Sequence, residues 1–309
     1  MINFFCLSEV LWSLKKFFYI GILFFVLFTL FLSGCLNQDS GNKSSTDYNW
    51  STMDEGPYND KVSFATSIDL FNWTDSGRVL AEHASVPGAV YKDGVIYVYF
   101  VDVSVDGVPE RIGLVRSSDN GSTWSDKEYV VFKGIGDKVP VDPAPFLLED
   151  GRIRLYYFDI NEERSSAYPG RENKIYSAVS SDGVNFVQEE GVRFSKAGIY
   201  DPDVVKVGDT WKLYVGDVSG NRVISAVSID GLNFTEEGVA YTGGAVPDVY
   251  YEDGVYYLYT AGIDISTSKD GSSFSKTFYS FHASQGMVTA DPSVVKLGNN
   301  KYIMFYKFK

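Results

Sequence analysis

Pairs of short apolar strands, each pair joined by a tight polar turn, recur five times along the chain. The clearest copy is Tyr200–Asp217, in which two runs rich in alternating apolar residues flank the turn Gly208-Asp209. The other copies begin at Val86, Val141, Val246 and Ala290. Alternation with a period of two predicts half-buried β-strands, and Gly beside Asp between two such runs predicts a hairpin. The chain is therefore expected to be built from five equivalent β-hairpins.

A second signature follows four of the hairpins, after a third predicted strand. It has the form Ser-x-Asp, then Gly, then an aromatic residue, and its copies are Ser117–Trp124, Ser180–Phe186, Ser228–Phe234 and Ser268–Phe274. In such a turn the Ser and Asp side chains accept backbone N–H groups, and Gly supplies a positive φ. A degenerate fifth copy, Ser67–Trp73, precedes the first hairpin. We expect these turns to be structural.

The strands add up to a closed ring. A hairpin, a third strand, the Ser-x-Asp turn and a fourth strand make a four-stranded antiparallel blade, and radial stacking of blades protects the sheet edges. The fifth hairpin reaches Lys309 after only two strands, while Lys61–Thr66 and Arg78–Glu82 supply two unassigned strands before the first hairpin. N-terminal strands that complete the C-terminal blade would leave no open seam. The sequence therefore predicts an all-β, five-bladed β-propeller over residues 58–309.

The N-terminal residues 1–34 have the features of a lipoprotein signal peptide. Lys15-Lys16 precede an uncharged run, Phe17–Leu32, which ends in Leu32-Ser33-Gly34-Cys35. A basic start, an apolar stretch and small residues before a cleavage site are typical of secretion signals. The last four residues resemble a prokaryotic lipobox, which implies lipidation of Cys35, a polar tether over residues 35–57 and an extracytoplasmic, membrane-anchored lipoprotein. The alternative is an uncleaved transmembrane anchor.

Composition excludes several classes of partner and cofactor. The net charge is −13, from 40 acidic and 27 basic residues, which argues against nucleic acid and leaves the lipid anchor as the membrane contact. Because the two cysteines are Cys6 and Cys35 and the two histidines are His83 and His282, a disulfide-stapled propeller and a Cys- or His-rich metal site are excluded. No cofactor is expected, although calcium would suit oxygen ligands. We expect a monomer.

Candidate chemistry gathers where the inner strands start. Antiparallel strand direction places the start of each first strand and the end of each second strand on one face, so this face collects carboxylates around the channel mouth. The predicted residues are Asp142, Asp201, Asp203, Asp248 and Asp291, with Asp102, Asp159 and Asp217 from second-strand ends, His83 from an inter-blade loop, and Tyr200 and Tyr168 as flat apolar surfaces. Carboxylates a few ångströms apart cannot all ionise, so at least one pKa should rise. A protonated carboxyl beside an ionised one is what glycosidic bond cleavage uses. The alternative is that each Asp-Pro is a structural feature of the repeat.

The Asp-Pro strand starts and the Ser-x-Asp turns together resemble five-bladed propeller glycosidases of glycoside hydrolase family 43 and its relatives, families 32, 62, 68 and 130. The turn at Ser117 also resembles the Asp-box of sialidases. The resemblance implies a base Asp in the first blade, an orienting Asp in the second, which falls on Asp142, and a Glu as acid. Sialidases are a weaker match, because they are six-bladed and carry Arg-Ile-Pro where this chain has Arg111-Ile112-Gly113.

This chain departs from the family 43 pattern at two of the three positions. The first blade starts with Val86-Pro87-Gly88, which leaves the base unassigned, with Glu82 or Asp102 as substitutes. No inner strand starts with Glu, so Asp201 and Asp248 are the nearest replacements for the acid.

The sequence predicts a carbohydrate-active propeller, a glycoside hydrolase of the family 43 type. Its predicted catalytic carboxylates are Asp142, Asp201 and Asp248, and its predicted substrate-binding residues are His83, Asp102, Asp159, Tyr200, Asp203, Asp217 and Asp291. The alternative is a non-catalytic glycan- or protein-binding propeller that has lost the acid and the base.

Overall fold

The computed structural model describes residues 48–53, 56–165, 172–217, 219–284, 286, 288–298 and 300–309. Residues 48–309 make one compact unit. The predicted signal peptide, Cys35, residues 35–47 of the predicted tether and Tyr168 lie outside the described residues. Within the described part of the chain, none of the helices has the length and apolar character needed to cross a membrane.

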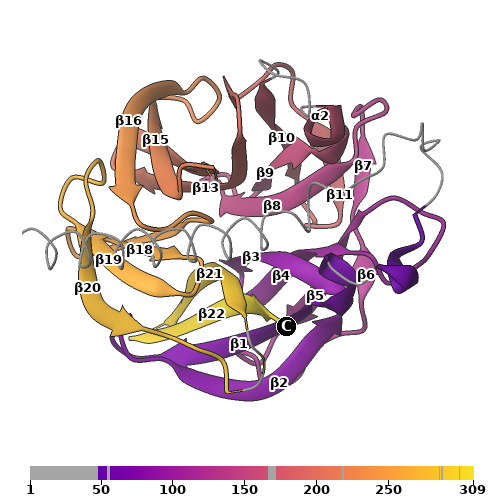
Figure 1. The fold of residues 1–309 in the computed structure, drawn as a ribbon, viewed down its shortest axis with the longest axis horizontal. Coiled ribbons are helices and arrows are strands. Elements are labelled where there is room, and N and C mark those ends of the chain that lie inside the picture. Colours follow the sequence, from indigo (N-terminus) through magenta and orange to yellow (C-terminus); the bar gives the residue numbers. More distant parts are fainter. Residues whose placement is uncertain are drawn as a thin grey trace, which may run out of the picture. The chain divides into compact units, whose positions relative to one another are not determined.

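Five antiparallel sheets surround a central axis, as predicted (Figure 1). Blade 1 consists of β3 (Ala84–Lys92), β4 (Val95–Asp102), β5 (Arg111–Ser117) and β6 (Glu128–Tyr129). Blade 2 contains β8 (Pro140–Leu147), β9 (Ile153–Asp159), β10 (Asn173–Ser180) and β11 (Asn185–Gln188). Blade 3 consists of β13 (Ile199–Val207), β14 (Thr210–Asp217), β15 (Arg222–Ser228) and β16 (Thr235–Thr242). Blade 4 consists of β17 (Asp248–Glu252), β18 (Val255–Thr260), β19 (Asp264–Ser268) and β20 (Ser275–Ser280).

The fifth blade joins the two ends of the compact unit. Its order from the axis outward is β21 (Thr289–Gly298), β22 (Lys301–Phe308), β1 (Lys61–Ser67) and β2 (Thr74–Glu82). Strands β1 and β22 pair without a break from Lys61–Phe308 to Ser67–Tyr302. The predicted closure is confirmed, because N-terminal strands complete the C-terminal blade and pair its open edge.

Blade 2 carries additions that the sequence did not predict. Strand β7 (Val131–Lys133) pairs in parallel with β11, and β12 (Phe194–Lys196) pairs with β10. The short helix α2 (Ile160–Ser165) follows β9. Blade 2 is therefore broader than the others.

Outside blade 2, two 3₁₀ turns, η1 (Trp50–Thr52) and η2 (Pro57–Asn59), precede β1.

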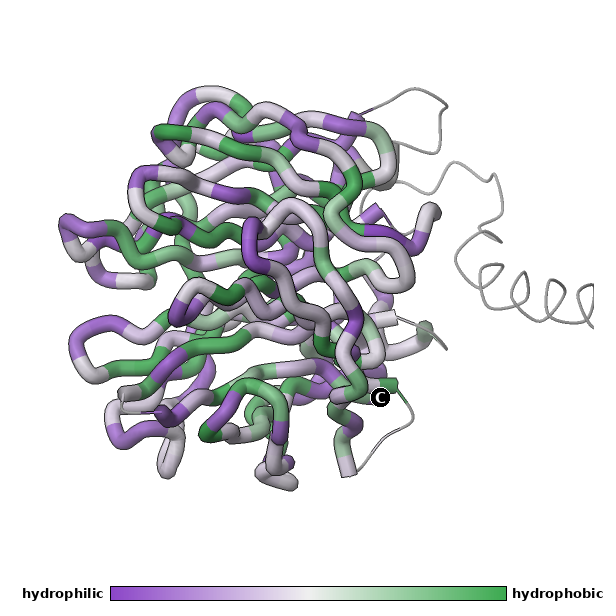
Figure 2. Tube along the Cα trace, turned by 90° about the vertical axis from the view of Figure 1, so that its left-hand side faces the viewer, coloured by the Kyte–Doolittle hydropathy of each residue, from purple (hydrophilic) through white to green (hydrophobic). Residues whose placement is uncertain are grey.

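The core lies between neighbouring blades. Apolar stretches follow the strands and hydrophilic residues occupy many of the turns (Figure 2). The largest fully buried side chains are mostly tyrosines and phenylalanines, among them Tyr99, Tyr156, Tyr214 and Tyr259. These four occupy equivalent positions on the second strands, so the aromatic residues of the repeat fill the wedges between the blades.

Buried tyrosines also connect blades 1 to 4, each to the next blade, by hydrogen bonds. The hydroxyls of Tyr99, Tyr156 and Tyr214 donate to the carbonyls of Gly183, Gly231 and Gly271 in the Ser-x-Asp turns, at 2.9, 2.8 and 2.7 Å. Tyr259 donates in the same way to Leu70 at 2.8 Å. The turns are thus anchored from the neighbouring blade, which supports the structural role expected for them.

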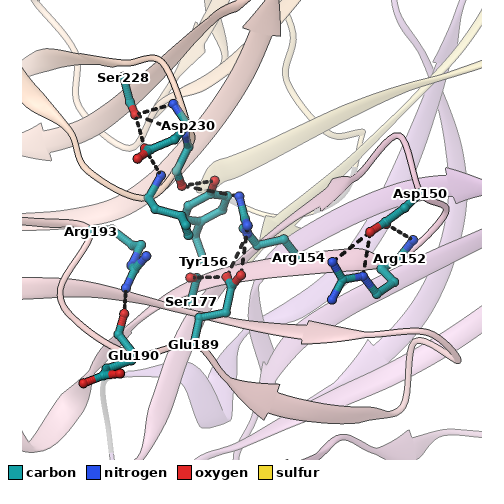
Figure 3. Close-up of polar contacts among 12 residues, drawn as sticks. Asp150, Arg152, Arg154, Tyr156, Ser177, Glu189, Glu190, Arg193, Ser228 and Asp230 are labelled. Carbon is teal, nitrogen blue, oxygen red and sulfur yellow. Dashed lines mark hydrogen bonds and ion pairs between the residues drawn. The ribbon is translucent and has the colours of Figure 1, made fainter.

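The junction of blades 2 and 3 adds an ion pair to this tyrosine bond (Figure 3). Arg154 contacts both carboxylate oxygens of Glu189 at 2.8 Å, and Ser177 donates to the same carboxylate at 2.7 Å. In the adjacent turn Asp230 accepts from Ser228 Oγ at 2.8 Å. Hydrogen bonds from Asn233 and Leu232 hold the pKa of Asp230 well below its usual range. Arg154 Nη1 also donates to the carbonyl of Gly231 at 3.5 Å, so the ion pair holds Arg154 against the turn of blade 3.

Candidate functional site

The inner strands of all five blades open onto one cavity on the axis. Its volume is about 230 Å³, and its lining comes from the starts of β3, β8, β13, β17 and β21 and the residues just before them. Five carboxylates line it, namely Asp142, Asp201, Asp203, Asp248 and Asp291. Five of the residues predicted from the sequence therefore meet at one place, which we call the axial cavity.

A repeated backbone feature directs these side chains. The residue before the strand-start proline has a left-handed φ in every blade, between 48° and 59°, and these residues are Val86, Asp142, Asp201, Val246 and Asp291. In four blades a register shift, a β-bulge, lies at this place. A bulge turns a side chain out of the regular pleat. Asp tolerates the left-handed region better than most residues, whereas a β-branched Val is strained there.

The residue after the proline contacts the next blade. Asp203 Oδ2 accepts from the backbone N of Val249 at 2.8 Å, and Asp248 Oδ2 accepts from the N of Val294 at 3.2 Å. Ser293 Oγ accepts from the N of Ala89 at 2.9 Å. Asp203 and Asp248 therefore have a structural role at the blade junctions in addition to facing the cavity.

Burial sets the charge of Asp203 and Asp248. Only 7% of Asp248 is exposed. Burial raises the pKa of Asp203. Burial, and then repulsion by Asp203, raise the pKa of Asp248 well above its usual range. Because the two groups act on each other, the pair keeps a proton at a pH where an isolated aspartate has lost it.

Asp291 forms an ion pair with Lys307, a residue that was not predicted from the sequence. Its Oδ2 lies 3.1 Å from Lys307 Nζ, and the same ammonium is 3.5 Å from Asp60 Oδ2. Asp291 Oδ2 also accepts from the backbone N of Val86 at 3.3 Å. A sequence signal existed for Lys307, because it is a charged residue in an otherwise apolar or aromatic strand, Tyr302–Phe308.

The predicted residues at the second-strand ends do not line the axial cavity. Asp102 pairs with Lys127 at 2.5 Å, Asp159 accepts from the N of Val139 at 2.9 Å, and Asp217 pairs with Arg222 at 2.7 Å. Each carboxylate is thus engaged by a residue near its own blade. Their role in substrate binding stays a prediction.

His83 and Tyr200 also lie outside the cavity lining. The His83 ring stacks on Tyr58 with 3.9 Å between ring centroids, and its Nδ1 lies 2.6 Å from the Tyr58 carbonyl oxygen. Tyr200 packs edge-on against Phe158. Glu82, one substitute for the base, is exposed and lies 3.5 Å from Lys61. The described residues include no group of three or more His, Cys, Asp or Glu side chains placed to hold a metal ion.

Comparison with known proteins gives a likeness in structure alone. The sequence matches no protein-family model and no curated protein. A family 32 β-fructofuranosidase from Bombyx mori has a TM-score of 0.55 at 17% identity, over 81% of this chain and 57% of that one. An endo-1,4-β-xylanase from Bacteroides thetaiotaomicron gives 0.54 at 18%, over 69% and 80%. A GH43_1 enzyme from Xanthomonas citri, solved with xylotriose, gives 0.51 at 17%, over 72% and 86%.

This chain spans 57% of the length of the Bombyx mori enzyme, so the remainder of that protein has no counterpart in the comparison. At such identities the likeness concerns the fold. The protein therefore has the five-bladed propeller fold found in glycoside hydrolases of families 32 and 43.

Proposed function

We propose that this protein is a glycoside hydrolase that binds a saccharide in the axial cavity and cleaves a glycosidic bond there with carboxylates of the inner strands. The observation that carries the proposal is the convergence of five aspartates on one cavity of about 230 Å³. Burial raises the pKa of two of them, Asp203 and Asp248. The fold shared with family 32 and 43 enzymes gives further support.

The proposed reaction divides the roles between two groups of carboxylates. The Asp203–Asp248 pair donates its proton to the glycosidic oxygen, the bond from that oxygen to the anomeric carbon breaks, and the leaving sugar departs as an alcohol. An ionised carboxylate, Asp142 or Asp201, acts on the anomeric side as base toward water or as nucleophile. Water supplies the oxygen that ends on the anomeric carbon. In the base route its proton goes to Asp142 or Asp201, and exchange with solvent returns both groups to their starting states. In the nucleophile route the deprotonated Asp203–Asp248 pair takes that proton and is restored directly.

A second function remains in competition, because two observations favour it. Val86 stands where the first-blade Asp of family 43 is expected, and Asp203 and Asp248 accept backbone N–H groups of the next blade. Both observations suit a propeller that binds glycans or proteins without turnover. Saccharide binding with no hydrolysis would select this alternative.

Hydrolysis should be sought on 4-nitrophenyl β-xyloside and α-arabinofuranoside, on xylotriose and on sucrose. We expect turnover of at least one, and we expect Asp142→Asn combined with Asp201→Asn to lower kcat by 10²-fold or more, the effect of losing a catalytic base. Asp209→Asn, in the exposed turn between β13 and β14, is the control and should retain full activity. Turnover that survives the double substitution would contradict the proposed site.

We further propose that the propeller is a monomer held on the outer face of a membrane by a lipid on Cys35. The support is the sequence Leu32-Ser33-Gly34-Cys35 after an uncharged run. Labelling of cells with a radioactive fatty acid should mark the wild-type protein and not Cys35→Ser. Equal labelling of both would refute the anchor, and light scattering of the purified propeller tests the monomer.

A further inference from the structure

Lys307 breaks the fivefold repeat beside the axial cavity. It pairs with Ala290, directly before the left-handed Asp291. The residues that pair at the same place in blades 1, 2 and 3 are Val101, Phe158 and Gly216, and Ala261 donates its N–H there in blade 4. Four blades place an uncharged residue at this position and one places a lysine. The repeat does not require a charge at this position, so the reason for Lys307 must lie in its contacts within and beside blade 5.

The contacts of Lys307 tie three separate segments together. Its Nζ lies 3.1 Å from Asp291 Oδ2 on β21 and 3.5 Å from Asp60 Oδ2, in front of β1. Asp291 also accepts from the N of Val86 in blade 1, so the ion pair lies where blade 5 meets blade 1. Only 5% of the Asp291 side chain and 25% of the Lys307 side chain are exposed. Two donors, Lys307 Nζ and the backbone N–H of Val86, therefore fix the direction of the Asp291 carboxylate.

The charges around Lys307 all favour its protonated form. Burial alone would lower the pKa of Lys307, but Asp291, Asp60 and more distantly Asp201 together raise it above its ordinary value. Burial raises the pKa of Asp60, and Asp291 adds to that rise, while Lys307 and Lys309 oppose it. Lys307 is therefore the ammonium that balances the acidic groups on this side of the cavity.

Blades 3 and 4 contribute two carboxylates in a different environment. Asp248 is buried and Asp203 is half-buried, neither has an ion pair with a described residue, and both accept backbone N–H groups of the next blade. The axial cavity thus combines a carboxylate paired with a lysine, Asp291, and two aspartates whose pKa values are raised by burial.

We propose that Lys307 is a positioning residue, whose ammonium holds the carboxylate of Asp291 in place at the wall of the axial cavity and balances the acidic side chains of Asp60 and Asp291. The assignment rests on the proposed function for its catalytic consequence, but its electrostatic part holds for the free protein. It adds to the site a cation from the second strand of blade 5, and not from the inner strands.

The electrostatic part is tested by ¹³C NMR of the side chains. In the wild type, the Lys307 Cε signal should titrate above the ordinary lysine pKa of about 10.4. In Lys307→Met the Asp60 carboxyl signal should titrate at a higher pH than in the wild type, because Asp291 still faces Asp60 and the balancing cation is gone. Lys307→Arg should restore the wild-type titration. Lys301→Met, an exposed lysine at the start of β22, should have no effect.

Two results would overturn the assignment. One is an unchanged Asp60 titration in Lys307→Met. The other is a Lys307 signal in the wild type that titrates at or below the ordinary lysine value, which decides the matter even when the Met variant does not fold.

The catalytic part is tested on whichever glycoside the wild type hydrolyses. Lys307→Met should lose kcat/KM on the order of 100-fold, the cost of misplacing by about 1 Å a group that orients the substrate, mostly in kcat and with an altered pH profile. Lys307→Arg should recover most of the activity. An unchanged pH profile and kcat/KM in Lys307→Met would refute the positioning role. If the wild type hydrolyses nothing, the proposed function fails, while the titrations still decide the role of Lys307.

Discussion

Gly88→Ala is expected to destabilise the propeller by about 3 kcal/mol or more, at or beyond the upper end of the usual cost of overpacking. A Cβ on Gly88 would lie 1.8 Å from the carbonyl oxygen of Pro143 and 2.7 Å from Cδ of Pro145. Both atoms belong to the inner strand of blade 2, which cannot move away without disturbing its own bulge. Blades 1 and 2 would have to separate at the axial cavity, and urea unfolding followed by circular dichroism would measure the loss.

The control for Gly88→Ala is its counterpart in the neighbouring blade. Ala144 follows the strand-start proline of blade 2 exactly as Gly88 follows that of blade 1. Ala144→Gly removes a Cβ and should cost at most about 1 kcal/mol, chiefly through backbone entropy. An unfolding free energy of Gly88→Ala close to that of the wild type would mean that the two inner strands do not approach each other as closely as the structure has them.

Much of the architecture could be predicted because it depends on local chemistry. Two-residue alternation, the Gly-Asp turns and the Ser-x-Asp turns act within a few residues, and they recur in every blade. Closure by Lys61–Ser67 followed from counting strands, and its pairing with β22 confirms that count. The narrow additions in blade 2 could not be foreseen, because β7 and β12 are three residues long and lack a periodic pattern.

The site was harder to predict because it depends on which side chains meet, both inside a blade and between blades. The sequence placed Asp102, Asp159 and Asp217 on the same face as the inner-strand aspartates, but Lys127, Val139 and Arg222 engage them. Those partners are a loop lysine, a backbone N–H just before β8 and the first residue of β15, and the repeat does not say which of them each carboxylate contacts. The Asp248–Val294 contact likewise depends on which residues face each other across a junction, and the Lys307 contacts depend on which segments of blade 5 lie side by side. Periodicity within a blade carries no information on that point.

The left-handed residues show how the repeat was modified at the cavity. Three of the five positions before proline are Asp, which tolerates this conformation, and two are Val, which does not. Val86 and Val246 therefore retain a backbone geometry without the residue type that suits it. At Val86 this coincides with the loss of the first-blade carboxylate that the family 43 resemblance implies. The charge of the cavity is concentrated instead on blades 2 to 5, which is why the acid is sought at Asp203 and Asp248.

Asp248→Asn is expected to make the folded protein more stable at pH 8 while abolishing most of the proposed hydrolysis. The unfolded pKa of an aspartate is about 3.9, and the folded pKa of Asp248 lies well above its ordinary value because of burial and Asp203. The folded state therefore binds more protons than the unfolded state above pH 4, and stability declines as the pH rises through the folded pKa. Each unit by which folding raises the pKa of Asp248 costs about 1.4 kcal/mol of unfolding free energy once the pH exceeds the folded pKa.

Asparagine removes that penalty and keeps the contact across the blades, since its amide oxygen can accept the N–H of Val294 as Asp248 does at 3.2 Å. Unfolding in urea at pH 4 and pH 8 should show similar stabilities of variant and wild type at pH 4 and a clear advantage of the variant at pH 8. Asp209→Asn, exposed in a turn, should show no such difference. Because the variant loses one of the two carboxyls proposed as the acid, kcat should fall by 10²-fold or more. A stability difference that does not change with pH would show that Asp248 is ionised in the folded protein, and the acid would then have to lie elsewhere in the cavity.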